Sequence, residues 1–297
     1  MKVIVKIFLY SSIIALIYYL FSIDYDTFKG LNINYLSLSA SIFFLISGFL
    51  FSVLSWFVAL KLHGVGLTFK QAVVSQGIPV FTKYIPGRVW TILGRAALIK
   101  DDQKSIKILS FISFKEQLIY LCLGILISIY PILQTDKIKE YAVIIILLTG
   151  LMFFILFSRN FQEWLEGIWH KIFKKQIYFP KLNVKEFLQM SLIIIIWWLL
   201  WAMGFYFLIK SVTDTVPLYF AFAFPLSIVI GLVSIIFPGG IGIREGVLIL
   251  FLVSNGISME ISVLVSVLAR IWFVLAEVIL FITAMIFKKQ NQALYNL

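Results

Sequence analysis

The sequence predicts an all-α polytopic membrane protein with six full spans and two re-entrant hairpins. Of the 297 residues, 62% are hydrophobic and only 13% are charged, whereas a soluble domain is about half apolar and about a quarter charged. Apolar runs long enough to cross a bilayer recur from end to end. Two further apolar stretches are broken by proline and glycine, which predicts helices that enter the membrane without crossing it.

Six segments have the roughly 20 apolar residues that a bilayer core requires. The first, 3–23, exceeds the length of a signal-peptide core and has no small-residue cleavage site, so we expect a retained helix. The last is long enough to span with tilt. The six predicted spans are 3–23, 36–60, 105–131, 141–158, 186–209 and 258–287.

The two broken stretches, 68–99 and 217–255, are predicted to enter the membrane and return to the side from which they came. With a cytoplasmic N-terminus, this topology places fifteen lysines and arginines in inner loops and four in outer loops. Such a bias is expected of short loops. It predicts a bacterial or archaeal cytoplasmic membrane protein with both termini in the cytoplasm. Eight spans, with the broken stretches counted as crossings, is the alternative.

The chain is predicted to form one integral membrane domain over residues 1–297. Its first half, 1–131, holds one hairpin, and its second half, 186–297, holds the other. Residues 132–185 supply a linking span and an inner loop. In this loop, apolar residues at helical spacing lie beside lysines, which is typical of an amphipathic helix on an anionic leaflet.

Each broken stretch contains a Pro-Gly break followed by a short helix with an arginine in its first turns. The predicted backbone hinges are Pro86, Gly87, Pro238, Gly239 and Gly240. Proline removes a backbone donor, and glycine allows the unusual dihedrals that follow. The free N–H groups of the new helix then favour an anion. Broken helices at corresponding places in two halves indicate a transporter with inverted repeats.

Charged residues at membrane depth are normally paired, face a cavity and are functional. Five cations are therefore the candidate substrate-binding residues, and three acids are their candidate charge partners. With Lys115 included, six cations face only three acids at membrane depth, so we expect an anionic ligand to compensate the surplus positive charge. Phosphate is the anion that suits arginine side chains beside a helix N-terminus. The predicted cations are Lys83, Arg88, Arg95, Arg244 and Arg270, and the acids are Glu116, Glu245 and Glu277.

A purely structural role for these charges is the alternative. In that case Arg244–Glu245 and Arg270–Glu277 would be structural pairs, and the other arginines would extend to the inner surface. Glu116 fits this alternative less well, because a carboxylate in the middle of a hydrophobic span needs a tertiary partner such as Arg88 or Arg95, or a proton.

Other chemistry has little support in the sequence. No G-x-x-x-x-G-K-[ST] loop is present, so no ATPase activity is expected. The two histidines, His63 and His170, lack metal-ligand spacing, and one cysteine, Cys122, forms neither an intrachain disulfide nor a cysteine metal cluster. We expect no cofactor, no metal and no nucleic-acid partner. Whether the chain is an enzyme stays open, although a non-enzymatic role is favoured.

Two motifs resemble the lysylphosphatidylglycerol synthase transmembrane-region family, and the resemblance covers nearly the whole chain. The motifs are Lys83-Tyr84-Ile85-Pro86-Gly87-Arg88-Val89-Trp90 with Gly94-Arg95, and Pro238-Gly239-Gly240-Ile241-Gly242-Ile243-Arg244-Glu245-Gly246. Glu116 stands where the family has a glutamate, and Arg270 with Trp272 and Glu277 resembles the variant of cell-envelope polysaccharide gene clusters. In the full synthase a soluble aminoacyl-transferase domain follows the membrane region. Because the chain ends at Leu297, we expect it not to attach lysine to a lipid by itself.

The resemblance implies a membrane protein that moves an anionic phospholipid or a polyprenyl-phosphate lipid between leaflets, with envelope-polysaccharide enzymes as the protein partners it suggests. Two other functions stay open. One is a membrane glycosyltransferase that uses a polyprenyl-phosphate sugar, for which Asp24-Tyr25-Asp26 could hold a divalent cation. The other is a non-catalytic scaffold of a synthesis complex, which has little need for charges at membrane depth.

Overall fold

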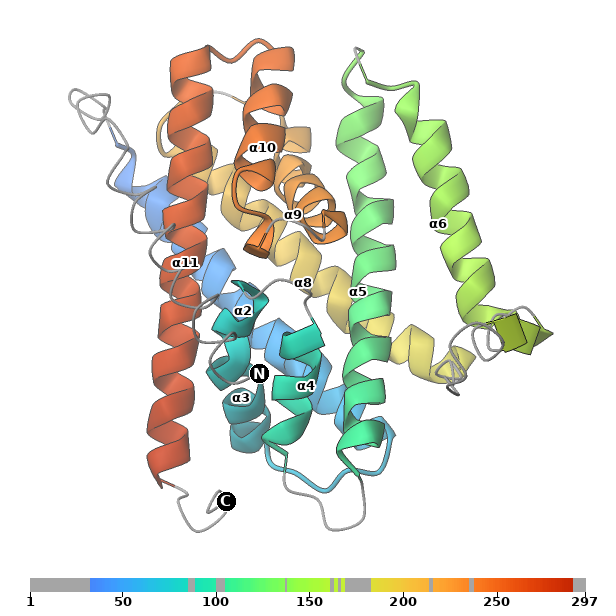
Figure 1. The fold of residues 1–297 in the computed structure, drawn as a ribbon. Coiled ribbons are helices and arrows are strands. Elements are labelled where there is room, and N and C mark those ends of the chain that lie inside the picture. Colours follow the sequence, from blue (N-terminus) through green and yellow to red (C-terminus); the bar gives the residue numbers. More distant parts are fainter. Residues whose placement is uncertain are drawn as a thin grey trace.

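A computed structural model describes nine stretches of the chain, and its regular elements there are all helices (Figure 1). The predicted first span at 3–23, the Asp24-Tyr25-Asp26 triplet, the Pro86-Gly87-Arg88 break and most of the predicted amphipathic helix lie outside the described residues. The described residues are 33–84, 89–99, 105–136, 138–160, 163–164, 167–168, 183–213, 216–234 and 238–290.

Four helices are long and apolar enough to cross a membrane. They are α2 (Tyr35–Leu62), α5 (Ile106–Leu133), α8 (Val184–Lys210) and α11 (Met259–Gln290). A helix of 28 residues, such as α2, is about 42 Å long at 1.5 Å per residue, which exceeds a hydrocarbon core of about 30 Å. A fifth helix, α6 (Tyr141–Phe157), is apolar but only 17 residues long. The count of six spans therefore stays a prediction.

Local sequence sets where the long helices begin. α2, α5 and α8 each start at a residue whose side-chain oxygen accepts a backbone N–H of the first turn, namely Asn34, Ser105 and Asn183. Such caps satisfy donors that a helix N-terminus otherwise leaves free. The helices therefore start at polar residues that bound the apolar runs, as expected for segments that begin at a membrane surface.

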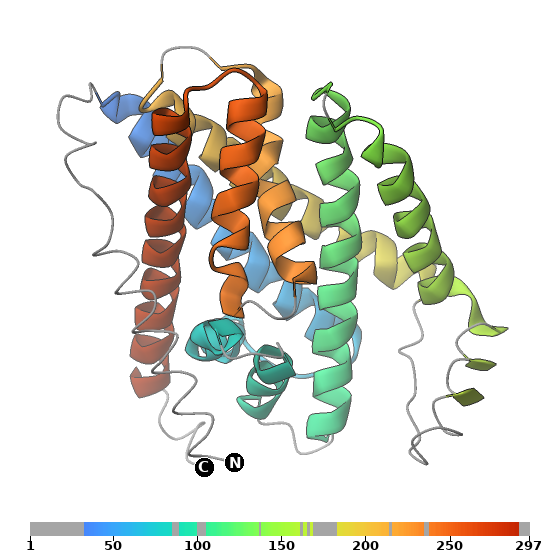
Figure 2. The ribbon, with the colours of Figure 1, turned by 45° about the horizontal axis from the view of Figure 1, so that its top comes forward.

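Helices α2 and α8 run diagonally across the bundle and pack against each other along their length (Figures 1 and 2). Small residues bring them close: a Cβ at Gly48 would lie 2.3 Å from Cδ1 of Trp201. The Ser41 hydroxyl donates a 2.7 Å hydrogen bond to the carbonyl of Gly204. Small residues and interhelical hydrogen bonds are the means by which helices associate in lipid, where burial of apolar surface gives little driving force.

The two broken stretches are each divided into short helices. The first broken segment consists of α3 (Phe69–Gly77), η2 (Ile78–Tyr84) and α4 (Val89–Ala97). The second consists of η3 (Leu218–Phe222), α9 (Ala223–Val233), η4 (Pro238–Gly240) and α10 (Ile243–Ser254). The longest single α-helix among them, α10, has 12 residues and is about 18 Å long. The helix that η3 and α9 form together, Leu218–Val233, is also shorter than the roughly 20 residues that a bilayer core requires.

The broken segments occupy opposite ends of the bundle. In Figures 1 and 2 the first lies toward the lower end, where α11 finishes, and the second lies toward the upper end, where α11 begins. Their breaks meet between these ends, because η2 contacts η4. A Cβ at Gly239 would lie only 2.4 Å from Cδ1 of Tyr84. We call the residues at this contact the first tip (Lys83 and Tyr84) and the second tip (Pro238–Gly240).

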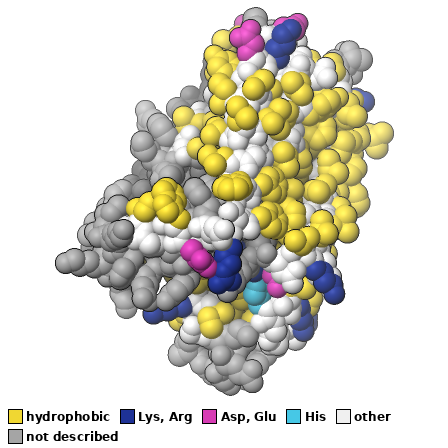
Figure 3. Space-filling view, turned by 90° about the vertical axis from the view of Figure 1, so that its right-hand side faces the viewer, with side chains coloured by type: hydrophobic (Ala, Val, Ile, Leu, Met, Phe, Trp, Pro, Cys, Tyr) yellow, Lys and Arg dark blue, Asp and Glu magenta, His cyan; other side chains and the backbone are white. Residues whose placement is uncertain are grey.

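The surface has the distribution of side chains expected of a membrane protein. On the face shown in Figure 3, hydrophobic side chains cover the middle, and charged side chains appear at its upper end and across its lower part. Large apolar side chains of α6 are more than half exposed, for example Leu147 at 67% and Val143 at 61%. Such a continuous apolar surface suits contact with lipid rather than with water.

Candidate functional site

A cavity of about 500 Å³ lies where the two broken segments meet. Charged residues from both segments line it: Lys83 and Arg95 from the first, Arg244 from the second, and Glu277 from α11. The rest of the lining is largely apolar and aromatic, with Phe49, Tyr120, Trp197, Trp201 and Phe273 among its rings. A concave apolar site with a few convergent polar groups is the usual form of a ligand pocket.

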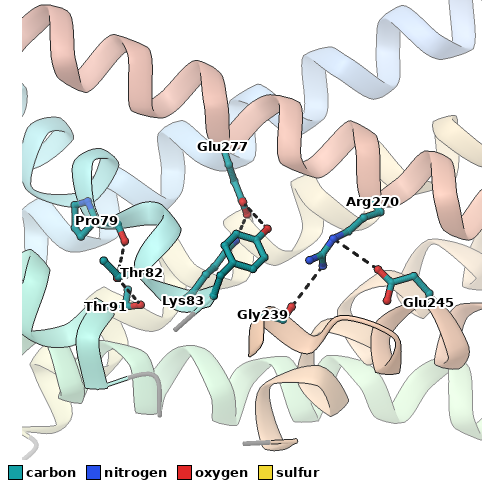
Figure 4. A network of polar contacts seen from close by, with 9 residues as sticks. Pro79, Thr82, Lys83, Thr91, Gly239, Glu245, Arg270 and Glu277 are labelled. Carbon is teal, nitrogen blue, oxygen red and sulfur yellow. Dashed lines mark hydrogen bonds and ion pairs between the residues drawn. The ribbon is translucent and has the colours of Figure 1, made fainter. Parts of the chain in front are cut away.

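The first tip is held by an acid of α11. The Glu277 carboxylate pairs with the Lys83 ammonium group and accepts a 3.1 Å hydrogen bond from the Tyr84 hydroxyl (Figure 4). Glu277 is fully buried, and its neighbour Phe273 places a ring 5.1 Å from the Lys83 nitrogen. Burial of a carboxylate requires such partners, so this pair fixes the first tip against α11.

The second tip depends on glycine. Gly239 and Gly240 have φ angles of +61° and +69°, and Gly242, two residues further on, has +82°. These angles lie in the left-handed region that other L-residues avoid. The N–H of Gly242 donates a 2.7 Å hydrogen bond to Oε2 of Glu245, which closes the first turn of α10.

A cation of α11 holds the second tip. Nη1 of Arg270 donates a 3.4 Å hydrogen bond to the Gly239 carbonyl, and Nε lies 3.7 Å from Oε1 of Glu245 (Figure 4). The guanidinium carbon also lies 5.5 Å from the centre of the Tyr84 ring, which belongs to the first tip. Arg270 therefore contacts both tips at the point where they meet.

The third charge cluster lies on the α4 and α5 side of the cavity. Nη1 of Arg95 is 2.7 Å from Oε2 of Glu116, and Oε1 of Glu116 accepts a 2.8 Å hydrogen bond from the Ser55 hydroxyl. The Arg95 guanidinium lies 4.1 Å above the Trp56 ring, and its Nη2 donates to Gln76. Both charged side chains are almost completely buried, so each depends on the other for compensation.

Arg244 differs from these three cations. No acidic side chain among the described residues forms an ion pair with it within 4 Å. Its guanidinium instead lies 4.9 Å from the Phe273 ring and 5.5 Å from the Phe224 ring, and its aliphatic part lies against the backbone of Gly231 and Gly240. Arg244 is 9% exposed and lines the cavity, so its charge is available to a ligand there.

Of the five cations predicted to bind substrate, Lys83, Arg95 and Arg244 line one cavity. Arg270 holds the two tips and is not among the lining residues, while Arg88 lies outside the described part of the chain. Lys115 is at a separate place, where it contacts His63 at 2.9 Å and Glu186 at 3.0 Å.

The alternative pairings, Arg244–Glu245 and Arg270–Glu277, are not among the ion pairs of the described residues. Instead, every pair in the site joins two different elements. Sequence reasoning also missed three polar partners that the fold supplies, namely Ser55, Gln76 and the Tyr84 hydroxyl. The sequence signal that could have identified these partners is that each is a polar residue within or beside an apolar stretch.

The geometry can be compared with known families. The family model for the lysylphosphatidylglycerol synthase transmembrane region matches residues 3–280. The chain belongs to this family. A comparison with curated proteins finds no match. The family range contains both Pro-Gly breaks and all three charge clusters, so the membrane domain that defines the family includes the whole cavity.

Membership of the lysylphosphatidylglycerol synthase transmembrane-region family confirms the resemblance seen in the two motifs. It agrees with the four long apolar helices and supports a multi-pass membrane protein that contacts the bilayer. Among the described residues no group of three His, Cys, Asp or Glu side chains could hold a metal ion. The described lining of the cavity offers three cations, the Glu277 carboxylate and several aromatic rings.

Proposed function

We propose that this protein moves an anionic lipid between the leaflets of a bacterial or archaeal cytoplasmic membrane. The cavity at the two breaks is the observation that carries the proposal, because Lys83, Arg95 and Arg244 line it from both broken segments. A cation buried at membrane depth is costly unless it has a functional ligand. Arginine binds phosphate oxygens through several parallel donors, so a lipid phosphate is the ligand that suits this lining.

The proposed topology has six spans and two re-entrant hairpins that enter from opposite sides and form an inverted repeat. The opposite placement of the two broken segments supports it (Figure 1). So does charge: the ends of α2, α5, α8 and α11 at the lower side of Figure 1 carry Lys61, Lys107, Lys185, Lys288 and Lys289. That side is assigned to the cytoplasm, together with both termini.

The lipid tails need a route that keeps them in the bilayer while the headgroup occupies the cavity. The part of the cavity wall formed by α4 and α5 has an apolar strip beside its polar residues, with Val89, Ile92, Phe114, Leu118 and Leu121 in the lining. Val89 is 55% exposed at the outer surface. We place the lateral opening between these helices, because an apolar wall that reaches the surface offers acyl or prenyl chains a continuous path.

In the proposed mechanism the headgroup phosphate binds at Arg244, the lining cation that forms no ion pair with an acid among the described residues. Lys83 stays paired with Glu277, and Arg95 stays paired with Glu116. Glu245 remains with Arg270 and keeps the second tip in place. One hairpin then rocks against the other half and carries the headgroup past the point where the tips meet.

Reconstitution in vesicles tests the proposal. The protein is inserted into phosphatidylcholine vesicles that contain tail-labelled phosphatidylglycerol or tail-labelled phosphatidylcholine, and the label reaching the other leaflet is measured by chemical quenching. We expect faster movement of the anionic lipid, and a loss of at least about tenfold in Arg244→Gln, which corresponds to about 1.4 kcal/mol. Lys139→Gln changes an exposed lysine paired with Asp136 and serves as the control. Equal movement of both lipids, unchanged by Arg244→Gln, would contradict the proposal.

A further inference from the structure

We infer that the cavity compensates a single negative charge, so that its ligand is a phosphodiester monoanion, and a phosphomonoester enters only in its singly charged form. The inference rests on the proposed function and narrows its substrate class. It decides between two headgroups that share phosphate chemistry: the phosphodiester of an ordinary anionic phospholipid and the terminal monoester of a polyprenyl phosphate.

The charge balance of the described residues is the first step. Four cations surround the meeting point of the two broken segments, and three acids accompany them. Glu277 pairs with Lys83, Glu116 pairs with Arg95, and Glu245 lies beside Arg270. The remaining cation is Arg244, so this cluster carries one net positive charge.

The surroundings of Arg244 are the second step. The ionisable groups around it are Arg270, Glu245, Tyr84 and Tyr120. Arg270 and Glu245 compensate each other, and neither tyrosine supplies a carboxylate. Contacts with Phe224 and Phe273 stabilise the delocalised charge, but a ring face is no replacement for an acceptor oxygen. One singly charged oxyanion at Arg244 would make the cluster neutral.

A second negative charge would find no free cation among these residues. It would need to take Lys83 from Glu277 or Arg95 from Glu116, and would leave the displaced acid buried without compensation. Both carboxylates are fully buried, where an unpaired charge is strongly unfavourable. The described residues therefore compensate a doubly charged headgroup only if it takes up a proton.

This requirement separates the two headgroups by pH. A phosphodiester carries one negative charge throughout the ordinary pH range, whereas a phosphomonoester carries between one and two, with a second pKa of about 6. Phosphatidic acid presents a monoester on the same acyl chains as phosphatidylglycerol. The pair therefore changes headgroup charge while the tails and the leaflet probe stay the same.

The experiment compares tail-labelled phosphatidylglycerol and tail-labelled phosphatidic acid in vesicles that contain the full chain, at pH about 5 and about 8, on either side of the monoester pKa. We expect phosphatidylglycerol to move at both values, and phosphatidic acid to move at the lower pH and at least about tenfold more slowly at the higher one. Phosphatidylglycerol also reports any effect of pH on the protein itself.

A charge variant tests whether the net charge of the cluster sets the limit. Glu277→Gln keeps an acceptor for the Tyr84 hydroxyl but removes the carboxylate that compensates Lys83, which raises the net charge of the cluster by one. We expect this variant to move phosphatidic acid at the higher pH. Size-exclusion chromatography in detergent, rather than lipid movement, checks that this variant is folded. If the folded variant does not move phosphatidic acid at the higher pH, the charge limit is contradicted; if the variant does not fold, the comparison of the two lipids in the wild-type protein decides the inference.

The outcomes separate the two proposals. Equal movement of both lipids at the higher pH would overturn the charge limit and leave lipid movement intact. Movement of neither lipid at either pH, in protein that remains folded, would overturn the proposed function together with the inference. Faster movement of phosphatidic acid at the higher pH would assign the cavity to phosphomonoesters, such as a polyprenyl phosphate, and would also overturn the charge limit.

Discussion

The buried pair between Arg95 and Glu116 allows a direct measurement of how strongly charge compensation holds the site together. The change is Glu116→Gln, which keeps the length of the side chain and an oxygen in reach of the Ser55 hydroxyl that now donates to Oε1. It removes only the negative charge 2.7 Å from Arg95. Any loss of stability therefore reports on compensation rather than on packing.

The expected magnitude follows from burial. Arg95 is 3% exposed and Glu116 is fully buried, so the variant leaves a guanidinium in an apolar interior with Gln76 and the ring of Trp56 as its remaining partners. Removal of one partner from a buried ion pair destabilises proteins by about 3–5 kcal/mol. We expect a loss near the lower end of this range, because the contact between Arg95 and Trp56 persists.

The measurement is equilibrium unfolding in detergent micelles, arranged as a double-mutant cycle with Arg95→Gln. The double variant should be more stable than the sum of the two single losses predicts, by about 1–3 kcal/mol, as coupled neighbours usually show. The control is Asp136→Asn, at an acid that is 94% exposed and pairs with Lys139. This surface change should alter the free energy of unfolding by less than about 1 kcal/mol.

Two results would refute the reasoning. The first is additivity of the two single changes, which would show that Arg95 and Glu116 do not compensate each other. The second is a loss below about 1 kcal/mol for Glu116→Gln alone, a magnitude typical of exposed pairs. That result would indicate that Glu116 does not compensate Arg95 as a carboxylate, and the cluster around the cavity would then carry two net positive charges rather than one.

Three further changes test the tips and the helix packing by the same unfolding measurement. Gly239→Ala should lower the free energy of unfolding by about 1–3 kcal/mol, because the φ of Gly239 is +61° and the new Cβ would lie 2.4 Å from the Tyr84 ring. The control is Gly246→Ala, which has no atom within 4 Å of its Cβ and should leave stability unchanged. Equal losses in the two variants would contradict the role of the second tip. Tyr84→Phe removes one hydrogen bond to a buried carboxylate and should lose about 1–3 kcal/mol; an unchanged stability would mean that this hydroxyl does not hold the tip. Gly48→Ala places a Cβ 2.3 Å from Trp201 and should lose about 1–3 kcal/mol by overpacking, and a neutral result would show that α2 and α8 are free to separate.

The long helices could be predicted closely from sequence. Residues 36–60 were expected as a span and α2 runs from Tyr35 to Leu62, and residues 186–209 correspond to α8 from Val184 to Lys210. Length and uninterrupted apolar character define such elements without knowledge of their neighbours. Polar caps such as Asn34 and Asn183 then fix the ends, so local sequence is sufficient for this part of the fold.

The partners of the buried charges could not be predicted in this way. Spacing along one helix suggested Arg270 with Glu277, but Glu277 holds Lys83 and Arg270 lies beside Glu245. A charge at membrane depth pairs with whatever element lies nearest in space, and sequence spacing describes only its own helix. Lys115 shows the same limit, since its acidic partner is Glu186 of α8, 71 residues away.

The pairing that sequence missed bears directly on how the tips could move. Arg270 and Glu277 lie seven residues apart on α11, about 10 Å along its axis, and each holds a different tip: Glu277 binds Lys83 and Tyr84, and Arg270 binds the Gly239 carbonyl. Pairs within one helix would leave both tips free, whereas pairs with α11 hold each tip until a partner is replaced. Because the two tips are held by different residues of α11, opening of the Lys83–Glu277 pair would release the first tip, while Arg270 would keep the second. The two halves would then move one after the other, which is the order that alternating access requires, because a simultaneous release would open the cavity to both leaflets at once.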